Sequence, residues 1–257
     1  MQPTPTPTPT PTTVPIMGIP IAPMPMAEAA IWISAWVKSH TGRAVFTVNP
    51  EIAMLARRDP EFAAILRSAD LNVADGVGIL LAAWLARRTV PARTAGIDLV
   101  EHLAAIGDSL GWRVYLLGGA TGVAQSAGEA LARRHPRLNI VGWSAPDAGP
   151  DLDDDTVAAI NAARPDLLLV AFGAPRQERW IARNLSRLDI GVAMGVGGSL
   201  DFLAGDVPRA PRPLRALGLE WLYRLVRQPW RWRRMLVLPA FAIAALRQVA
   251  AGRRREG

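Results

Sequence analysis

Short apolar runs alternate along most of the chain with longer stretches in which apolar residues recur every three or four positions. The short runs predict buried strands, and the recurrent spacing predicts amphipathic helices. In residues 97–110, for example, Ile97, Val100, Leu103 and Ile106 share one helical face. The predicted strands are 44–48, 71–74, 112–117, 138–143, 166–172 and 190–194. The predicted helices are 27–39, one that starts at Pro50, 60–68, 77–87, 97–110, 123–134, 153–163 and 176–188.

This repeated order of strand, turn and helix predicts an α/β fold. We expect a mostly parallel, Rossmann-like sheet with helices on both faces. Connections between parallel strands are right-handed, and ligands bind outside the carboxyl ends of the strands. The polar turns that follow the strands should therefore lie together at one edge of the sheet.

The N-terminal end of the chain departs from this alternation. Residues 1–15 alternate proline with threonine, which predicts an extended, disordered leader. This leader has neither the basic start nor the continuous apolar core of a signal peptide. Residues 16–25 are apolar but broken by prolines, which favours at best a short edge strand.

After residue 205 the sequence becomes basic and predicts a helical C-terminal appendage. Two helices are expected, 214–227 and 230–250, and Pro239 could kink the second one. The segment from residue 206 onwards carries a charge of +9, whereas the whole chain carries +7, so the rest is near neutral at −2. A basic appendage favours a polyanionic partner such as phospholipid, nucleic acid or a diphosphate.

The second of these helices has the pattern of a helix at a membrane surface. Its apolar run, residues 235–246, is shorter than the about 20 residues that a transmembrane helix needs. Trp230 and Trp232 alternate there with arginines, which suits aromatic rings at headgroup depth and guanidiniums on lipid phosphates. The alternative is a basic helix that simply packs on the rest of the protein.

The composition removes several kinds of site. The chain has no cysteine, which excludes disulfides, thiolate nucleophiles and cysteine-based zinc sites. Its three histidines, His40, His102 and His135, share no ligand spacing, so no histidine-based metal site is expected. The acidic run 151–155 starts a predicted helix, and we interpret it as a solvated cap. We therefore expect no metal and no cofactor.

Asp75 is the focus of the predicted site. It follows the strand 71–74 and precedes Gly76 and Gly78, which open an apolar helix. A carboxylate flanked by glycines at the carboxyl end of a strand is where an open α/β sheet places its chemistry. Asp is also a favoured N-cap, so Asp75 taken alone could simply cap the next helix. The expected convergence of the turns favours the site.

Three glycine-bearing turns also follow strands and could receive a phosphate group. The turn at 118–122 has neither the G-x-G-x-x-G spacing nor the Gly-Lys-Ser/Thr of a P-loop. The turn at 195–201 suits an anion better, because glycines let a ligand approach the backbone. Asp201 could accept hydrogen bonds from a ribose or a base. The turn at 173–178 puts Arg, Gln and Glu at a helix start. Pro and Glu are also common at helix N-termini for purely structural reasons.

Seven short segments stand out in chain order. They are Thr47-x-Asn49, Ala74-Asp75-Gly76-x-Gly78, Arg93-x-x-Gly96, Gly173-x-Pro175-x-Gln177-Glu178, Gly195-Val196-Gly197-Gly198-x-x-Asp201-x-x-x-Gly205, Arg209-Ala210-Pro211 and Glu220-Trp221-x-x-Arg224. In this order they resemble the WecG/TagA/CpsF family of bacterial glycosyltransferases, from about residue 19 to about residue 234. The ordered set is far more specific than any one segment.

The resemblance implies transfer of a sugar from a UDP-sugar to an undecaprenyl-diphosphate-linked sugar, with inversion and without a metal. Family members transfer N-acetylmannosamine, its uronic acid or glucose, in teichoic acid linkage units, enterobacterial common antigen and exopolysaccharides. Residues 16–205 are then the catalytic domain, and residues 206–257 form an appendage that associates with an anionic membrane surface. The implied location is cytoplasmic, peripheral on the inner face of the plasma membrane.

The resemblance also implies roles for individual residues. Asp75 matches the proposed general base, and Asp201 matches a nucleotide contact. The other matched positions are Thr47, Asn49, Arg93 and Gln177 in the active site, and Arg224, Arg231 and Arg234 in the appendage, where arginines are thought to complete the site at the membrane. The glycines of the three turns are the candidate contacts of the UDP-sugar: Gly118, Gly173, Gly197 and Gly198.

The residues support this chemistry independently of the resemblance. The acceptor hydroxyl must lose a proton as it attacks the anomeric carbon, and a carboxylate within hydrogen-bond reach can take that proton. UDP leaves with developing negative charge. Arginines and helix N-termini can stabilise that charge in place of Mg²⁺.

Two other functions fit parts of the sequence. A nicotinamide-dependent sugar oxidoreductase would use the Rossmann-like sheet, but G-x-G-x-x-G is missing and Lys38, the only lysine, leaves no Tyr-x-x-x-Lys pair. A nucleic-acid-binding protein would use the arginines of the appendage and would bind in a salt-dependent way. The sheet edge carries more chemistry than a binding module needs, so no nucleic-acid partner is expected. A homo-oligomer that masks the appendage is a further hypothesis, and the donor sugar depends on a pocket shape that the sequence does not show.

Overall fold

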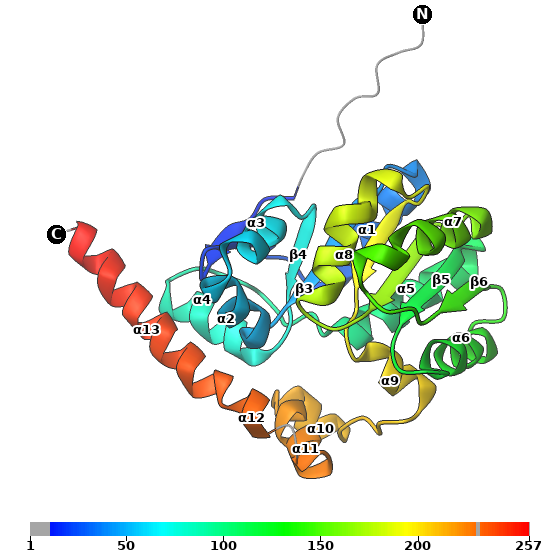
Figure 1. Ribbon diagram of the computed structural model, residues 1–257. Coiled ribbons are helices and arrows are strands. Elements are labelled where there is room, and N and C mark those ends of the chain that lie inside the picture. The colour runs from blue at the N-terminus through cyan, green and yellow to red at the C-terminus, as the bar shows by residue number, and fades with distance from the viewer. Residues whose placement is uncertain (1–10, 230–231, 257) are drawn as a thin grey trace, which may run out of the picture.

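A six-stranded parallel sheet forms the centre of the protein (Figure 1). The computed structural model describes residues 11–229 and 232–256. The strands of this sheet are β3 (Arg43–Val48), β4 (Leu71–Ala74), β5 (Arg113–Gly118), β6 (Asn139–Ser144), β7 (Leu167–Ala171) and β8 (Val192–Gly195). Their order across the sheet is β4-β3-β8-β7-β5-β6, and every neighbouring pair is parallel.

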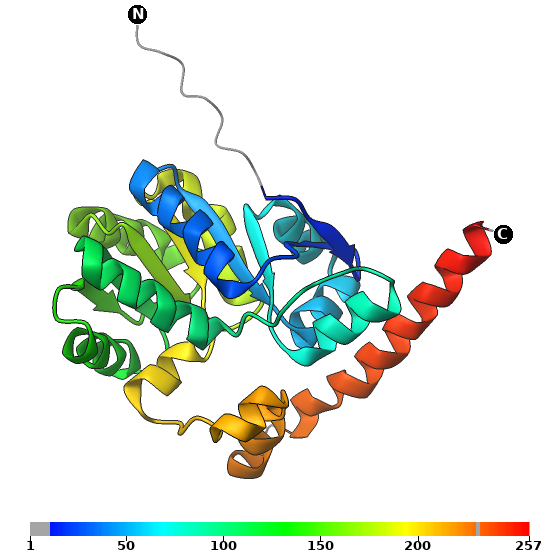
Figure 2. The same ribbon diagram turned by 180° about the vertical axis from the view of Figure 1, so that it is seen from behind.

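Helices cover both faces of this sheet (Figures 1 and 2). They are α1 (Met26–Ser39), α2 (Pro50–Arg58), α3 (Pro60–Ser68), α4 (Val77–Leu85), α5 (Gly96–Leu110), α6 (Val123–Arg134), α7 (Asp153–Ala163), α8 (Arg176–Asn184) and α9 (Ser199–Ala204). Helices α2, α3, α4, α7 and α8 pack on one face, and α1, α5, α6 and α9 pack on the other.

Successive residues of each strand face two separate hydrophobic cores. In β7, Leu168 and Val170 face the α2 side, whereas Leu167 and Leu169 face the α1 side. All of β7 is buried because helices cover both faces. This double burial explains why the sequence shows a continuous apolar run there rather than alternation.

The structure confirms the predicted α/β fold with its Rossmann-like parallel sheet. Helices α6 and α7 have the predicted bounds, and most strands shift by one or two residues, which is within the usual uncertainty of element ends. The predicted helix 77–87 ends earlier, at Leu85. The predicted helix 176–188 divides into α8 and a 3₁₀ turn at Leu185–Arg187.

The N-terminal segment forms an antiparallel hairpin of β1 (Val14–Ile16) and β2 (Ile19–Ile21). Two strands therefore form where one edge strand was expected, and β1 begins inside the predicted leader of residues 1–15. The first ten residues of that leader lie outside the described part of the chain. The prolines are tolerated because Pro15 and Pro20 lie opposite each other, at the pair next to the one that closes the turn, where an antiparallel ladder needs no N–H donor.

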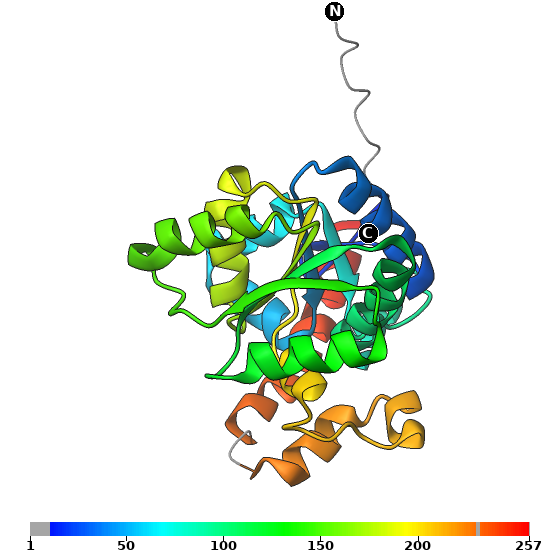
Figure 3. The ribbon, with the colours of Figure 1, turned by 90° about the vertical axis from the view of Figure 1, so that its right-hand side faces the viewer.

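The appendage consists of short helices followed by one long helix (Figures 1 and 2). They are α10 (Arg212–Ala216), α11 (Glu220–Arg227), α12 (Trp232–Met235) and α13 (Val237–Glu256). In Figure 3 the short helices lie below the body. The predicted helix 214–227 is split, because Gly218 takes a left-handed φ of 72°. The second predicted helix breaks at Leu236 and not at Pro239, which lies in the first turn of α13 where its missing N–H is not needed.

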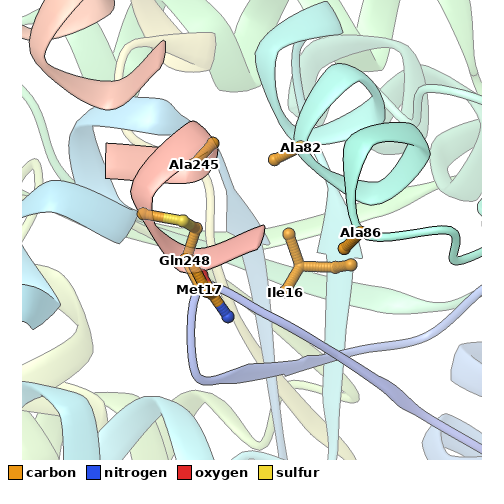
Figure 4. A pocket seen from close by; sticks show the side chains of 6 residues that line it. All are labelled: Ile16, Met17, Ala82, Ala86, Ala245 and Gln248. Atoms are coloured by element: carbon orange, nitrogen blue, oxygen red, sulfur yellow. The ribbon is translucent and has the colours of Figure 1, made fainter. Parts of the chain in front are cut away.

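Helix α13 packs on the body of the protein along one of its sides. Phe241, Ala244 and Ala245 are buried in the core that also contains α2 and α4. A small hollow marks the junction of α13 with α4 and the hairpin, and Figure 4 shows the side chains around it: Ile16, Met17, Ala82, Ala86, Ala245 and Gln248. Across residues 11–229 and 232–256, no helix is both long enough and apolar enough to cross a bilayer.

Candidate active site

The ends of neighbouring strands bring the candidate catalytic residues to one edge of the sheet (Figure 1). Asp75 directly follows β4, and its N–H donates to the Val48 carbonyl of β3 at 2.8 Å. The chain returns to this edge after α4, where the Thr94 N–H donates to the Ala74 carbonyl at 2.7 Å. These hydrogen bonds hold residues 93–96 beside Asp75.

The Asp75 carboxyl group is partly buried at this edge. Its Oδ2 accepts a hydrogen bond from the Gly96 N–H over a long distance of 3.4 Å. Burial raises the pKa of Asp75 to about 6, while the nearby Arg93 guanidinium acts in the opposite direction. The N-cap of α4 is Gly76, so the alternative interpretation of Asp75 as the cap of that helix is wrong.

Thr47 and Asn49 lie at the end of β3 but are used differently. Thr47 is buried, and its Oγ1 lies 3.3 Å from where a Cβ on Gly96 would stand. The same oxygen donates weakly, at 3.5 Å, to the Gly195 carbonyl at the end of β8. Asn49 caps α2, because its Oδ1 accepts from the Ile52 N–H at 3.0 Å. Thr47 thus lies beside the Asp75 segment, whereas the Asn49 oxygen serves a helix start.

Gln177 holds the glycine turn that follows β8. Its buried side chain accepts a hydrogen bond at Oε1 from the Gly197 N–H at 2.9 Å. Its Nε2 donates to Glu178 Oε1 at 2.8 Å. These two bonds fix the orientation of the carboxamide, because only its oxygen can accept and only its nitrogen can donate. The position of the turn therefore depends on Gln177.

Glu178 is a buried carboxyl group whose importance the sequence analysis missed. Its side chain is fully buried, and burial raises its pKa to about 7. Oε2 has no hydrogen-bond partner among the described residues. A signal was present in the sequence: Glu178 precedes the buried Ile181 by three positions and so shares its inward helical face.

The appendage reaches this edge of the sheet through Arg224 of α11. The guanidinium lies 4.6 Å from the ring centre of Phe202, and Nη2 lies 3.6 Å from Asp201 Oδ2. A Cβ on Gly198 would stand only 2.9 Å from the same Nη2. Gly198 and Asp201, both predicted to meet the nucleotide, are therefore in contact with an arginine that was also predicted to belong to the site.

A second arginine ties the appendage to the body. Arg209 forms an ion pair with Asp98 on α5 through Nη1, and its Nε lies 3.4 Å from Glu220 Oε1 on α11. Arg215 lies 3.9 Å from the same Asp98 oxygen. Asp98 and Glu220 are close enough to Asp75 that their charges also raise its pKa. Arg209 and Glu220 belong to the seven segments, although no role was predicted for either residue.

The remaining candidate residues lie elsewhere. Gly118 ends β5, which lies four positions across the sheet from β4, the strand that Asp75 follows. This separation corresponds to roughly 19 Å. The φ of 97° at Gly118 and a virtual Cβ 3.0 Å from the Ala171 backbone show that glycine is needed there for strand packing. Gly173 faces open space in the neighbouring turn. Arg234 lies in α12, and Arg231 lies outside the described residues.

The acidic run 151–155 is exposed as predicted except at Asp153. Asp153 is buried, and its Oδ2 accepts from Arg183 Nε at 3.0 Å, which holds the pKa of the carboxyl below its ordinary value despite burial. Asp154 pairs with Arg187 on the surface. Within the part of the chain that the structure describes, no group of three His, Asp or Glu side chains is arranged to hold a metal ion.

Comparison with known proteins identifies the family. The model of the Glycosyl transferase WecG/TagA/CpsF family matches residues 14–255. The chain belongs to this family. The resemblance drawn from the seven segments is confirmed, and so is the expectation of a glycosyltransferase. The match extends over most of α13. The seven segments end near residue 234 and do not cover this helix.

Several curated relatives carry one and the same name, N-acetylglucosaminyldiphosphoundecaprenol N-acetyl-beta-D-mannosaminyltransferase. The protein from Bacillus subtilis (strain 168) is 33% identical over 215 residues, 83% of this chain and 82% of the relative. The Bacillus spizizenii protein is 36% identical over 215 residues, with the same coverage. The Staphylococcus aureus (strain MW2) protein is 33% identical over 198 residues, 77% of each chain.

The raised pKa of Asp75 leads to a pH prediction. The resemblance implies that Asp75 is a general base, which must be deprotonated to act. On that assignment we expect kcat/KM for sugar transfer to be constant above pH 7 and to fall about tenfold per pH unit below about 6. Initial rates of UDP release between pH 4.5 and 8.5 measure this profile. The falling limb should persist in Glu178→Gln, which removes the other raised carboxyl group. A profile that stays flat down to pH 5 would contradict the assignment of Asp75.

Proposed function

We propose that the protein transfers a sugar from a UDP-sugar to an undecaprenyl-diphosphate-linked sugar during the synthesis of a cell-surface polysaccharide. The observation that carries this proposal is the Asp75 carboxyl group, with its pKa of about 6, at a sheet edge that also presents Arg93 and Arg224. One group there can accept a proton, and two can stabilise a leaving diphosphate. The names of the relatives support the same reaction and favour N-acetylmannosamine over its uronic acid or glucose as the transferred sugar.

In the proposed mechanism, Asp75 removes the proton from the acceptor hydroxyl as its oxygen attacks the anomeric carbon. A single displacement of this kind inverts the anomeric configuration. The glycosidic bond forms as the bond to UDP breaks, and the departing diphosphate takes up the negative charge. Arg93 and Arg224 stabilise that charge without a metal ion. The Gly197–Gly198 turn, held by Gln177, lets the donor approach the backbone.

The proposal extends to the cellular setting. Residues 16–205 form the catalytic domain, and residues 206–257 act as a membrane-associating appendage that supplies Arg224 to the site. The partners are the UDP-sugar, the polyprenyl-diphosphate-linked acceptor and an anionic membrane surface. The enzyme works at the cytoplasmic, inner face of the plasma membrane.

Release of UDP tests the proposed reaction directly. The purified full chain is incubated with a panel of UDP-sugars and a water-soluble, short-chain polyprenyl-diphosphate-linked GlcNAc or glucose, with EDTA present. We expect release that requires one particular donor together with the acceptor and survives EDTA. Release that disappears with EDTA and returns with Mg²⁺ would contradict metal-independent transfer. Absence of release with every pair, from protein that is folded, would overturn the proposed substrates.

Arg224 gives a second test of the site. Arg224→Ala should lower kcat/KM for the UDP-sugar about 10²-fold, because a charge-bearing donor near the leaving group is lost. Arg224→Lys should recover only part of this, since lysine keeps the charge but not the planar contact with Phe202. Arg227→Ala, an exposed arginine one turn away on the same helix, is the matched control and should leave transfer to the soluble acceptor unchanged. Equal losses in the two alanine variants would contradict the role of Arg224.

A further inference from the structure

Helix α4 presents an apolar row to solvent. Trp84 is 72% exposed, Leu81 50% and Val77 40%, and their spacing of four and three positions places them on one helical face. The opposite face, with Ile79 and Ala83, is buried in the core. A row of large exposed apolar side chains on one helix of a catalytic body is unusual unless it meets a partner.

This row begins at the site itself. Val77 comes two residues after Asp75, with only Gly76 between them. It also contacts the appendage, because a Cβ on Gly218 would overlap the Val77 side chain at 2.2 Å. Leu217, next to that glycine, is exposed as well. The apolar surface therefore runs from the α10–α11 turn past the candidate base and along α4.

Helix α13 carries a second outward row beside the first. Its buried side chains pack on α2 and α4. One of them, Ala245, lies at the junction with α4 that Figure 4 shows. Ile243 and Leu246 are three positions apart on α13, so they share one helical face, and both are about half exposed. Two adjacent helices, one from the body and one from the appendage, thus both expose apolar rows.

The two segments that carry these rows contain charges of only one sign. The sequence contains no Asp or Glu from Gly76 to Ile97, and none from residue 221 to residue 255. Arg87 and Arg88 follow the α4 row and are exposed, and Arg247 follows Leu246 and is exposed. Apolar side chains bordered by arginines complement an anionic lipid surface. The same face on a second copy of this chain would bring like charges together, which disfavours a symmetric dimer through it.

We propose that the α4 row of Val77, Leu81 and Trp84, together with the outward row of α13, inserts into the headgroup region of an anionic bilayer. The membrane contact then includes the catalytic body and is not confined to the arginine-rich appendage. Because α4 starts beside Asp75, this contact holds the base at the membrane surface, where the head of a lipid-linked acceptor lies. The acceptor part of this inference rests on the proposed function, whereas bilayer binding does not.

The test compares two double variants of the full chain. Leu81→Gln with Trp84→Gln removes the exposed row, and Ile31→Gln with Leu110→Gln makes the same kind of change at exposed residues of α1 and α5 on the other face of the sheet. Binding is measured by flotation with vesicles of phosphatidylglycerol and phosphatidylcholine. We expect at least about a tenfold loss of vesicle binding in the α4 variant and no change in the control, because only the former loses apolar area that enters the lipid.

Activity separates this inference from the proposed function. With acceptor embedded in the same vesicles, the α4 variant should lose about as much kcat/KM as it loses binding. With the water-soluble short-chain acceptor, it should match the unmodified protein. Flotation equal to that of the unmodified protein would overturn the inference, as would a change of oligomeric state in light scattering without loss of vesicle binding. If the unmodified protein and both variants are all inactive with both acceptors, the proposed reaction is overturned. Flotation still decides the membrane contact in that case.

Discussion

We expect Asp75→Asn to lower kcat for sugar transfer about 10³-fold, because the variant lacks a general base. Asparagine keeps the size of the side chain and can still accept the hydrogen bond from the Gly96 N–H, so the segment 93–96 stays in place. It cannot take a proton from the acceptor hydroxyl. UDP-sugar affinity should remain within a few-fold, because the proposed nucleotide contacts lie at Gly197, Asp201 and Arg224.

Two measurements on the same samples check this expectation. UDP release gives kcat, and calorimetric titration with UDP or the donor gives the dissociation constant. Asp155→Asn makes the same chemical change at an exposed carboxylate of α7 and should leave both values unchanged. Full activity of Asp75→Asn would exclude Asp75 as the base. Loss of donor binding together with activity would mean that Asp75 serves the donor and not the acceptor.

Glu178→Gln should change how stability depends on pH. Burial raises the pKa of Glu178 from 4.5 to about 7, so the folded protein holds this proton more tightly than the unfolded chain does. Stability is therefore lost as the pH rises from about 4.5 to about 7 and is constant above that. The shift corresponds to about 3 kcal/mol, because one pKa unit is about 1.4 kcal/mol. Glutamine is neutral throughout and removes this loss.

The checkable quantity is a difference between two pH values. Urea unfolding at pH 5 and pH 8 gives the free energy of unfolding for the variant and for the unmodified protein. The variant should gain up to about 3 kcal/mol relative to the unmodified protein on going from pH 5 to pH 8. Glu28→Gln, at an exposed position of α1, should show no such gain. An equal pH dependence for Glu178→Gln and the unmodified protein would mean that Glu178 is not titrating in the folded state between these values.

Asp75 and Glu178 show which features of a site can be predicted from sequence patterns. Asp75 was predictable, because a strand end, two glycines and an apolar helix define its place locally. Glu178 was interpreted as a polar residue at a helix start, where glutamate is common on the surface. Its burial depends on which face of α8 meets the core. That orientation arises from packing between segments far apart in the chain.

In the appendage, the basic character could be predicted from the sequence, but the partners of its arginines could not. Its basic character was evident from the arginines, and Arg224 stood in a recognisable motif. The pairing of Arg224 with Asp201 and of Arg209 with Asp98 joins residues on separate elements. Long side chains of this kind find partners only after the elements have packed, so spacing along the chain could not predict them. The break at Leu236 likewise replaced the expected kink at Pro239.

The sequence by itself determined the α/β fold, the parallel sheet and the edge at which Asp75, Thr47 and the glycine turns lie. Apolar periodicity and turn residues act over a few positions, and parallel strands must end at a common edge. Only the tertiary structure decided that α13 packs on α4, that Glu178 is buried, and that α4 leaves an apolar row exposed beside the base. These features depend on which surfaces of distant elements pack against one another. The free energy of that packing arises from contacts between segments, so no single segment of the sequence determines it.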